Sequence, residues 1–180
     1  MESITVSFLP TREDYADYQV SAAKAAVKQK DLLFMRICGS VLIFGGLIGA
    51  VFLGSRIYTN VINVLLILYG VFLVFYLDIL QPYLVKNAAM AYYDTHGEKM
   101  ISVSMTFSEE TVKIITDRYT ACLPYSMLWR VHEDPKTILF YTGIGEMRYL
   151  PKRTLSPEEL KKIHLILNDN KELSDRSKNG

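Results

Sequence analysis

Residues 37–80 read ICGSVLIFGGLIGAVFLGSRIYTNVINVLLILYGVFLVFYLDIL and contain two charged residues, Arg56 and Asp78. Residues 37–55 give 19 uncharged positions, and residues 57–77 give 21 more. At a helical rise of about 1.5 Å per residue, these lengths correspond to roughly 28 and 31 Å, close to the hydrocarbon thickness of a bilayer. The segment therefore predicts a hairpin of two membrane-spanning helices.

Basic residues are distributed unevenly around this hairpin. Those that flank the spans are Lys24, Lys28, Lys30, Arg36 and Lys86, whereas the connecting turn carries Arg56 alone. Because lysine and arginine concentrate on the cytoplasmic side of a membrane, both termini are predicted to be cytoplasmic. The first 36 residues carry many charges ahead of any apolar run, so the first span is expected to act as an uncleaved anchor.

Small residues in the first span predict close helix packing. Gly45 and Gly49 are four residues apart, and Gly46 begins a second small stripe, so helix backbones can approach closely there. We predict that these glycines pack the two spans within one chain, with self-association between chains as the alternative. Asn60 and Asn63 lie near the outer end of the second span, where water is expected to satisfy them, and neither a transporter nor a pore is predicted.

The segment before the hairpin begins with a strand pattern. Residues 3–9 alternate between apolar and polar side chains, as in a half-buried strand. Thr11 followed by Asp14 resembles a helix-capping box, and a helix is predicted from Arg12 to Arg36. Its lysines suit either a linker into the membrane, which we favour, or a basic surface that recruits anionic lipid.

The chain after residue 99 changes to a period of two. Six short strands are predicted, within residues 100–107, 112–116, 119–123, 129–133, 137–142 and 146–150. Ser156 then caps a final helix whose first position is Pro157. Six antiparallel strands closed by one helix predict a pleckstrin-homology-like domain. Residues 3–9 are a candidate seventh strand, in which case the hairpin is inserted between the first strand and the rest of the sheet.

These patterns predict an α+β membrane protein: a transmembrane hairpin, a small cytoplasmic antiparallel β domain and a C-terminal helix. The segments are residues 1–36 (strand and juxtamembrane helix), 37–80 (hairpin), 81–99 (connecting helix), 100–168 (β domain with its helix) and 169–180 (flexible tail).

Composition and residue spacing argue against several functions. The 20 basic and 19 acidic residues give no concentrated positive charge, so nucleic-acid binding is not expected. Cys38 and Cys122 are too few for a disulfide framework and are interpreted as buried small apolar groups. His96, His132 and His164 lack metal-ligand spacing, and no glycine-rich phosphate loop follows a strand. We therefore expect no metal, no cofactor and no enzymatic activity.

Lys152 and Arg153 are the strongest candidates for contact with a ligand. Two adjacent cations near a membrane suit a lipid phosphate or an acidic partner. Ordinary turn charges give the same pattern, and Glu158 and Glu159 are close enough in sequence to neutralise them.

Trp129 and Arg130 are candidates for a protein contact. Tryptophan and arginine anchor many interfaces. A single tryptophan in a strand is more often part of a core, and we favour that interpretation of Trp129.

Several motifs resemble one family. The hairpin followed by SMTFSEETVKI, LPYSMLWRVHED, ILFYT and YLPKRTLSPEEL is similar to the YcxB-like family of small bacterial membrane proteins. The matching positions are Pro124, Tyr125, Ser126, Val131 and Glu133 in one motif and Pro151, Lys152 and Arg153 in another. The resemblance covers residues 100–167 and implies a bacterial membrane location, but it transfers no catalytic residue.

The sequence thus predicts a multi-pass protein of the bacterial inner membrane that presents a pleckstrin-homology-like interaction module. The expected partners are the lipid bilayer and a protein or a second copy of the chain. The alternative is a structural subunit of a membrane complex, assembled through the hairpin.

Overall fold

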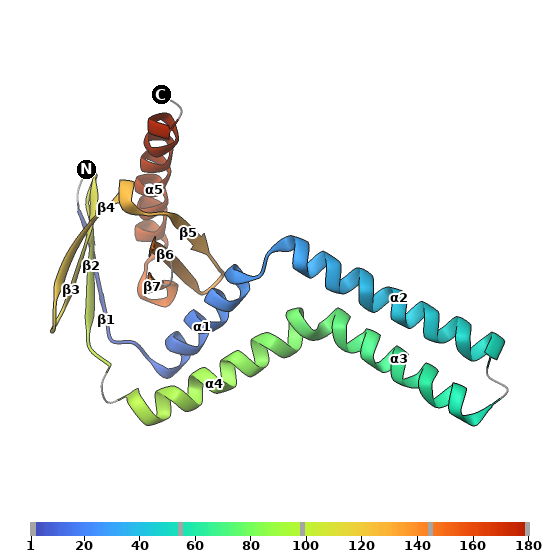
Figure 1. Ribbon diagram of the computed structural model, residues 1–180. Coiled ribbons are helices and arrows are strands. Elements are labelled where there is room, and N and C mark those ends of the chain that lie inside the picture. Colours follow the sequence, from blue (N-terminus) through green and yellow to red (C-terminus); the bar gives the residue numbers. More distant parts are fainter. Residues whose placement is uncertain (1–2, 54–55, 98–99, 144–145, 179–180) are drawn as a thin grey trace. The chain divides into compact units, whose positions relative to one another are not determined.

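The computed structural model describes residues 3–53, 56–97, 100–143 and 146–178, and nearly all of their side chains as far as residue 168. The chain divides into two compact units. Residues 23–87 form a helical hairpin, and the segments on either side of it form a unit of β-strands and helices, called the β unit below (Figure 1). This is the predicted α+β composition, with helices followed by antiparallel sheets and a C-terminal helix.

The first sheet of the β unit contains a strand from each side of the hairpin. Its antiparallel order is β1 (Ile4–Phe8), β2 (Val103–Phe107), β3 (Thr111–Thr116) and β4 (Thr120–Pro124). In the β1–β2 pair, Ile4 lies opposite Phe107 and Phe8 lies opposite Val103. The hypothesis that residues 3–9 join the later strands is therefore confirmed.

The second sheet follows a short 3-10 turn, η3 (Tyr125–Met127). It consists of β5 (Arg130–Glu133), β6 (Thr137–Gly143) and β7 (Glu146–Pro151), in that order and all antiparallel. Val131 of β5 lies opposite Phe140 of β6. Within the described ranges β5 pairs with β6 alone and forms one edge of the sheet.

The core of the β unit lies between the two sheets and the last helix. In β1 the odd-even alternation places Ile4, Val6 and Phe8 inside and the polar residues outside, as the sequence predicted. The rings of Phe107 and Phe140 lie 5.8 Å apart and join the two sheets. A second 3-10 turn, η4 (Lys152–Thr154), leads into helix α5 (Pro157–Lys178), which adds Ile163 and Ile166 to this core.

Helix α5 begins as predicted and ends later. The Ser156 backbone N–H donates to Glu159 Oε2 at 2.8 Å, and the Glu159 backbone N–H donates to Ser156 Oγ at 3.2 Å, which is a capping box. The helix continues to Lys178 instead of giving way to a flexible tail at residue 169. Since neither glycine nor proline occurs between Pro157 and Lys178, the sequence holds no strong stop signal there.

The prediction of one helix over residues 12–36 is wrong, because the chain forms two. Helix α1 (Arg12–Ala26) and helix α2 (Gln29–Leu53) are separated at Val27 and Lys28. The Val27 N–H donates to Lys24 O at 3.2 Å, which closes the end of α1 as a tighter turn. No glycine or proline marks the break, so the sequence pattern does not reveal it.

Within the described residues, two helical segments are long and apolar enough to cross a membrane, Gln29–Phe52 and Ile57–His96. The first lies in the hairpin unit, and the second runs from it into the β unit. The second combines α3 (Ile57–Phe75), the π turn η1 (Tyr76–Leu80) and α4 (Gln81–His96). The Gln81 N–H donates to Tyr76 O across the wide π turn. This turn lies directly before Pro82, which cannot supply an N–H to the regular helical pattern, so the helix continues past residue 77 without a break. Residues 54–55 of the predicted turn lie outside the described residues.

The interpretation of both cysteines as buried is wrong. Cys122 is exposed on β4, where it lies opposite Lys113, and Cys38 is half-buried in α2. Both are free thiols.

Candidate interaction site

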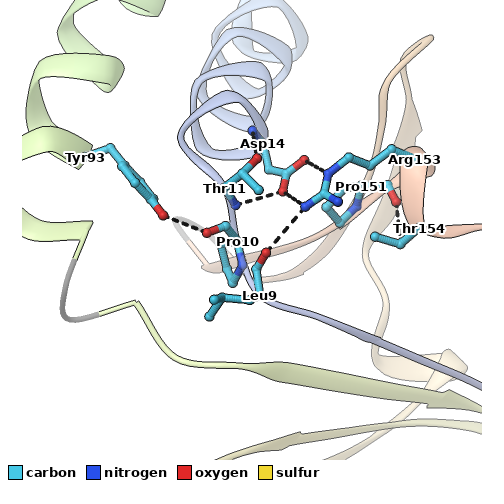
Figure 2. Close-up of polar contacts among 8 residues, drawn as sticks. All are labelled: Leu9, Pro10, Thr11, Asp14, Tyr93, Pro151, Arg153 and Thr154. Carbon is cyan, nitrogen blue, oxygen red and sulfur yellow. Dashed lines mark hydrogen bonds and ion pairs between the residues drawn. The ribbon is translucent and has the colours of Figure 1, made fainter.

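Asp14 and Arg153 form an ion pair between the start of α1 and the turn after β7 (Figure 2). Arg153 Nε donates to Asp14 Oδ1 at 2.6 Å, and Arg153 Nη2 donates to Asp14 Oδ2 at 2.5 Å. Such a two-point contact between guanidinium and carboxylate is among the stronger polar contacts in proteins. The Asp14 side chain is 5% exposed and that of Arg153 is 51% exposed, so the pair extends from the interior to the surface.

The same carboxylate caps helix α1. The Thr11 N–H donates to Asp14 Oδ2 at 2.9 Å, and the Asp14 N–H donates to Thr11 Oγ1 at 3.2 Å, which confirms the predicted capping box. Burial acts to raise the pKa of Asp14, but the hydrogen bonds from Arg153 and Thr11 outweigh it and hold the pKa below its ordinary value. Asp14 is therefore ionised at neutral pH.

Two further contacts hold the connection between β1 and α1. Arg153 Nη2 donates to the carbonyl oxygen of Leu9 at 3.4 Å, and the Tyr93 hydroxyl of α4 donates to the carbonyl oxygen of Pro10 at 2.8 Å (Figure 2). We call the set Leu9, Pro10, Thr11, Asp14, Tyr93 and Arg153 the helix junction. It joins the first turn of α1, the end of α4 and η4. The helices that lead into and out of the hairpin are thus attached to one place in the β unit.

Ring contacts extend this attachment. Tyr15 of α1 stacks on Tyr92 of α4 with a centroid distance of 5.7 Å. Tyr18 of α1 stacks on Tyr149 of β7 at 4.5 Å, and Phe8 of β1 lies 5.9 Å from Tyr149. Burial raises the pKa of the Tyr149 hydroxyl, so this ring stays neutral across the physiological range. Aromatic contacts therefore position α1 against β7 as well as against α4.

Lys152 and Arg153, adjacent in sequence, bind different carboxylates. Lys152 Nζ lies 2.6 Å from Glu133 Oε1, and His164 Nε2 of α5 lies 3.0 Å from Glu133 Oε2. Burial acts to raise the pKa of Glu133, but Lys152 and then His164 outweigh it and lower the pKa. The expected neutralisation by Glu158 and Glu159 does not explain these cations, because the carboxylates that bind them come from β5 and α1. Contact of Lys152 or Arg153 with a ligand stays a prediction.

Trp129 is exposed, and its interpretation as a core residue is wrong. Its side chain is 67% exposed, although its backbone N–H donates to Tyr141 O at 2.9 Å and extends the pairing of β5 with β6. Met127 and Val131 beside it are 64% and 39% exposed. We call Met127, Trp129 and Val131 the edge stripe. Arg130 turns away from it, with its guanidinium carbon 6.0 Å from the centre of the Tyr141 ring.

The glycines of the hairpin differ in what they contact. A side chain added at Gly46 would meet Asn63 O at 2.9 Å, and one added at Gly49 would meet Asn63 Oδ1 at 2.5 Å. Gly39 and Gly70, which the sequence prediction did not select, approach each other in the same way, with the Gly39 carbonyl oxygen 2.6 Å from a Cβ placed on Gly70. A side chain at Gly45 would meet no atom within 4 Å. Gly46 and Gly49 therefore pack within the chain as predicted, and Gly45 does not.

Asn63 is buried between the two helices instead of being satisfied by water. Its side chain is buried against Gly49, and its Nδ2 has no hydrogen-bond partner among the described atoms. An amide at the interface of two apolar helices favours a fixed helix register, because turning it outward would expose its polar atoms to hydrocarbon.

Comparison with known proteins finds a family match in the later part of the chain. Residues 107–165 match the model of the family described as YcxB-like protein. This part of the chain is YcxB-like. Neither the search of curated proteins nor that of solved structures found a match to the chain. The YcxB-like segment extends from the end of β2 to the middle of α5 and agrees with the resemblance seen in the motifs.

The YcxB-like segment contains the edge stripe and Arg153 but not Asp14. The rest of the helix junction comes from residues before the hairpin and from Tyr93 after it. Reasoning from sequence found the capping role of Asp14 but missed its partner, because Arg153 lies 139 positions away and no local pattern reports such a contact. It also missed Met127. No alternation could have found it, because residues 127–129 are all apolar and Met127 lies in the turn before β5.

Among the residues that the structure describes, no group of three or more histidine, cysteine, aspartate or glutamate side chains is placed to hold a metal ion. The contacts described above are ion pairs, hydrogen bonds and ring contacts, and the edge stripe adds exposed apolar side chains.

Proposed function

We propose that this protein is a membrane-anchored interaction protein, in which the α2–α3 hairpin spans a membrane and the β unit is a pleckstrin-homology-like module that binds another protein. The module is supported by the order of strands, four in one antiparallel sheet and three in the next, followed by a helix that contributes to their shared core. The membrane span is supported by the large apolar side chains that the hairpin exposes, such as Phe52 and Ile57.

The pairing of β1 with β2 supports a hairpin that returns to the side from which it started. These strands flank the hairpin in sequence and are hydrogen-bonded to each other, so a bilayer cannot lie between them. Basic residues before α2 favour the cytoplasmic side for the β unit. The family resemblance in the motifs favours the inner membrane of a bacterium.

The edge stripe is the observation that carries the proposed binding. Trp129, Val131 and Glu133 alternate along one side of β5, the side on which Val131 lies opposite the core residue Phe140. Helix α5 reaches the Glu133 end of this side through His164. The Trp129 end stays exposed, which leaves a large aromatic side chain next to the core without a cover. Aromatic side chains that become buried when a partner binds supply much of the binding free energy at many protein interfaces.

The backbone of β5 offers a second element of recognition. Because β5 is an edge strand in the described structure, its outer N–H and C=O groups have no neighbouring strand. An extended partner segment can pair with such an edge while its alternate side chains contact Trp129 and Val131. Backbone pairing would supply affinity, and the edge stripe would supply selectivity.

A photo-crosslinking amino acid at position 129 of the full-length protein tests this function in membranes of the native host. The matched control places it at Thr120, an exposed position on β4. We expect a discrete protein adduct from position 129 and none from position 120. We also expect Val131→Gln to reduce the adduct from position 129 at least fivefold, because it removes apolar contact worth about 1 kcal/mol.

Equal labelling at both positions, or no adduct at position 129, would contradict the proposal. The full chain is required, because a fragment that starts at residue 99 lacks β1 and leaves β2 unpaired on one side. Adducts that form from position 48 in α2, and not from position 129, would favour the alternative of a structural subunit assembled through the hairpin.

A further inference from the structure

Helix α2 carries two hollows that follow one another along a single face. The first, of about 460 Å³, lies beside the start of the helix and is lined by Lys30, Leu33 and Arg36 among others. The second, of about 560 Å³, is lined by Arg36 and by apolar residues further along the helix. Arg36 borders both hollows, so they adjoin at this side chain. We call the two adjoining hollows the groove, which has a cationic end and an apolar end.

The apolar end is open because of Gly45. Its neighbours on this face include Val41, Phe44 and Ile48, all of them well exposed. Between these larger side chains Gly45 leaves a gap, and a side chain placed there would meet no atom within 4 Å. The adjacent Gly46 is packed against α3, so the groove lies on a part of α2 that α3 does not cover.

Arg36 is held in place at the cationic end. Its Nη2 donates to Asp78 Oδ2 at 2.7 Å, and its side chain is still half exposed. A guanidinium has five N–H donors, so one contact with a carboxylate leaves donors for a phosphate oxygen. Lys30 adds a second cation on the same hollow.

The length of the groove fits one leaflet of a bilayer. Lys30 and Gly45 are 15 positions apart, which is roughly 22 Å along a helix. Half of a bilayer, including its headgroup region, is about 20–22 Å thick. The cationic and apolar ends of the groove are thus separated by the distance between a lipid headgroup and the end of its acyl chains.

We infer that this face of α2 binds one anionic phospholipid, with the phosphate between Lys30 and Arg36 and an acyl chain over Gly45. The inference rests on the proposed membrane span and goes beyond the proposed protein binding. Two cations at one end and an apolar channel at the other match a phospholipid, whereas a free phosphate would leave the apolar end unused. A second copy of α2 would fill the apolar end but bring a second Arg36 toward the first.

Native mass spectrometry of the full-length protein in a non-ionic detergent tests the site. The probes are phosphatidylglycerol, phosphatidylcholine and inorganic phosphate. We expect one phosphatidylglycerol to be retained about 25-fold more tightly than phosphatidylcholine, since each of the two basic residues contributes about fivefold. Millimolar inorganic phosphate is expected not to displace it.

Two variants address the two ends, each with a control. Lys30→Gln is expected to lower the affinity for phosphatidylglycerol about fivefold, whereas Lys28→Gln, which removes the same charge outside the hollow, should change it less than twofold. Gly45→Leu, which fills the apolar end, is expected to lower the affinity for both lipids without changing the helix content measured by circular dichroism.

Equal retention of the two lipids, an equal effect of Lys28→Gln, or full binding by Gly45→Leu would overturn the inference. Lipid-free dimers that Gly45→Leu abolishes would assign the groove to a second copy instead. Alkaline carbonate extraction separates this failure from a failure of the membrane proposal. If carbonate releases the protein from membranes, both proposals fall, and if the protein stays in the membrane, the lipid result decides this one alone.

Discussion

The hairpin exposes many of its large apolar residues, whereas the β unit buries most of its own. In the β unit, large apolar side chains such as Phe107 and Ile138 are fully buried. In the hairpin, Phe52 and Ile57 are about 80% exposed. Glycines line the contact between the helices and let the backbones approach closely. The hydrophobic effect drives the first arrangement. The second depends on close backbone approach, which is how helices associate in lipid.

The two regions also differ in how they treat a buried polar side chain. Asp14 in the β unit is bound by Arg153 and by the N–H of Thr11. Asn63 in the hairpin is buried with its Nδ2 unpaired among the described atoms. A buried charge needs several partners to persist, whereas an unpaired neutral amide costs less free energy to bury. Polar contacts therefore hold parts of the β unit together, and close packing holds the two helices of the hairpin together.

The largest effect is expected from Phe107→Ala, which removes the ring at the centre of the β unit. Truncation of a fully buried phenylalanine costs about 3–5 kcal/mol, and Phe107 is 0% exposed. Hydrogen exchange of the β1–β3 amides in the detergent-purified protein measures this loss. Phe44→Ala, at an exposed position of α2, is the control. A comparable loss for Phe44→Ala would show that this helix face is packed, and it would break the comparison between the two regions.

Gly46→Leu is expected to separate the helices of the hairpin. The new Cβ would lie 2.7 Å from Ile67 Cγ1 and 2.9 Å from Asn63 O, so α2 and α3 must move apart. Overpacking of this kind costs up to about 3 kcal/mol. The neighbouring substitution Gly45→Leu enters open space and should leave the thermal midpoint in lipid-free detergent unchanged. Equal thermal midpoints for the two variants would mean that moving α2 away from α3 does not destabilise the hairpin.

Asp14→Asn is expected to loosen the helix junction by about 2 kcal/mol, the range of a hydrogen bond to a charged group. The Arg153 guanidinium loses its carboxylate partner but remains half exposed, which limits the cost. Asp94→Asn breaks the surface pair with Arg12, at 2.7 Å, and is expected to cost much less than Asp14→Asn, because solvent screens an exposed pair. Urea unfolding followed by near-UV circular dichroism compares the two variants. Equal losses of unfolding free energy would contradict a larger stabilising role for Asp14.

Acid is expected to produce the smallest effect, and the carboxylates considered for it lie in the β unit. The pKa values of Asp14 and Glu133 are both lowered by folding. Their contribution is therefore complete above the unfolded pKa values, near 4, and is lost as the pH falls through the lower folded values. Unfolding free energy measured between pH 7 and pH 3 should decline below about pH 4. Asp14→Asn should flatten this decline, and an unchanged profile would assign it to other groups.

Much of the fold follows from local pattern, and the site does not. Alternation in residues 3–9 and 103–107 was enough to predict strands, and uncharged length was enough to predict the hairpin. The partner of Asp14 and the exposure of Trp129 depend on how the two sheets meet. Trp129 has the composition of a core residue, but the place of β5 at an edge decides its exposure. Sequence period determines which side of a strand a residue occupies, and topology determines whether that side is covered.

The pairing of β1 with β2 also imposes an order on synthesis. Thr5 hydrogen-bonds to Thr106 across 101 positions, so the ribosome must make the whole hairpin before β1 meets its neighbour. At roughly 5–20 residues per second, this leaves β1 without its partner strand for about 5–20 s. Membrane insertion of the hairpin would precede closure of the first sheet. Until then, an alternating apolar strand must be kept from pairing with other nascent chains.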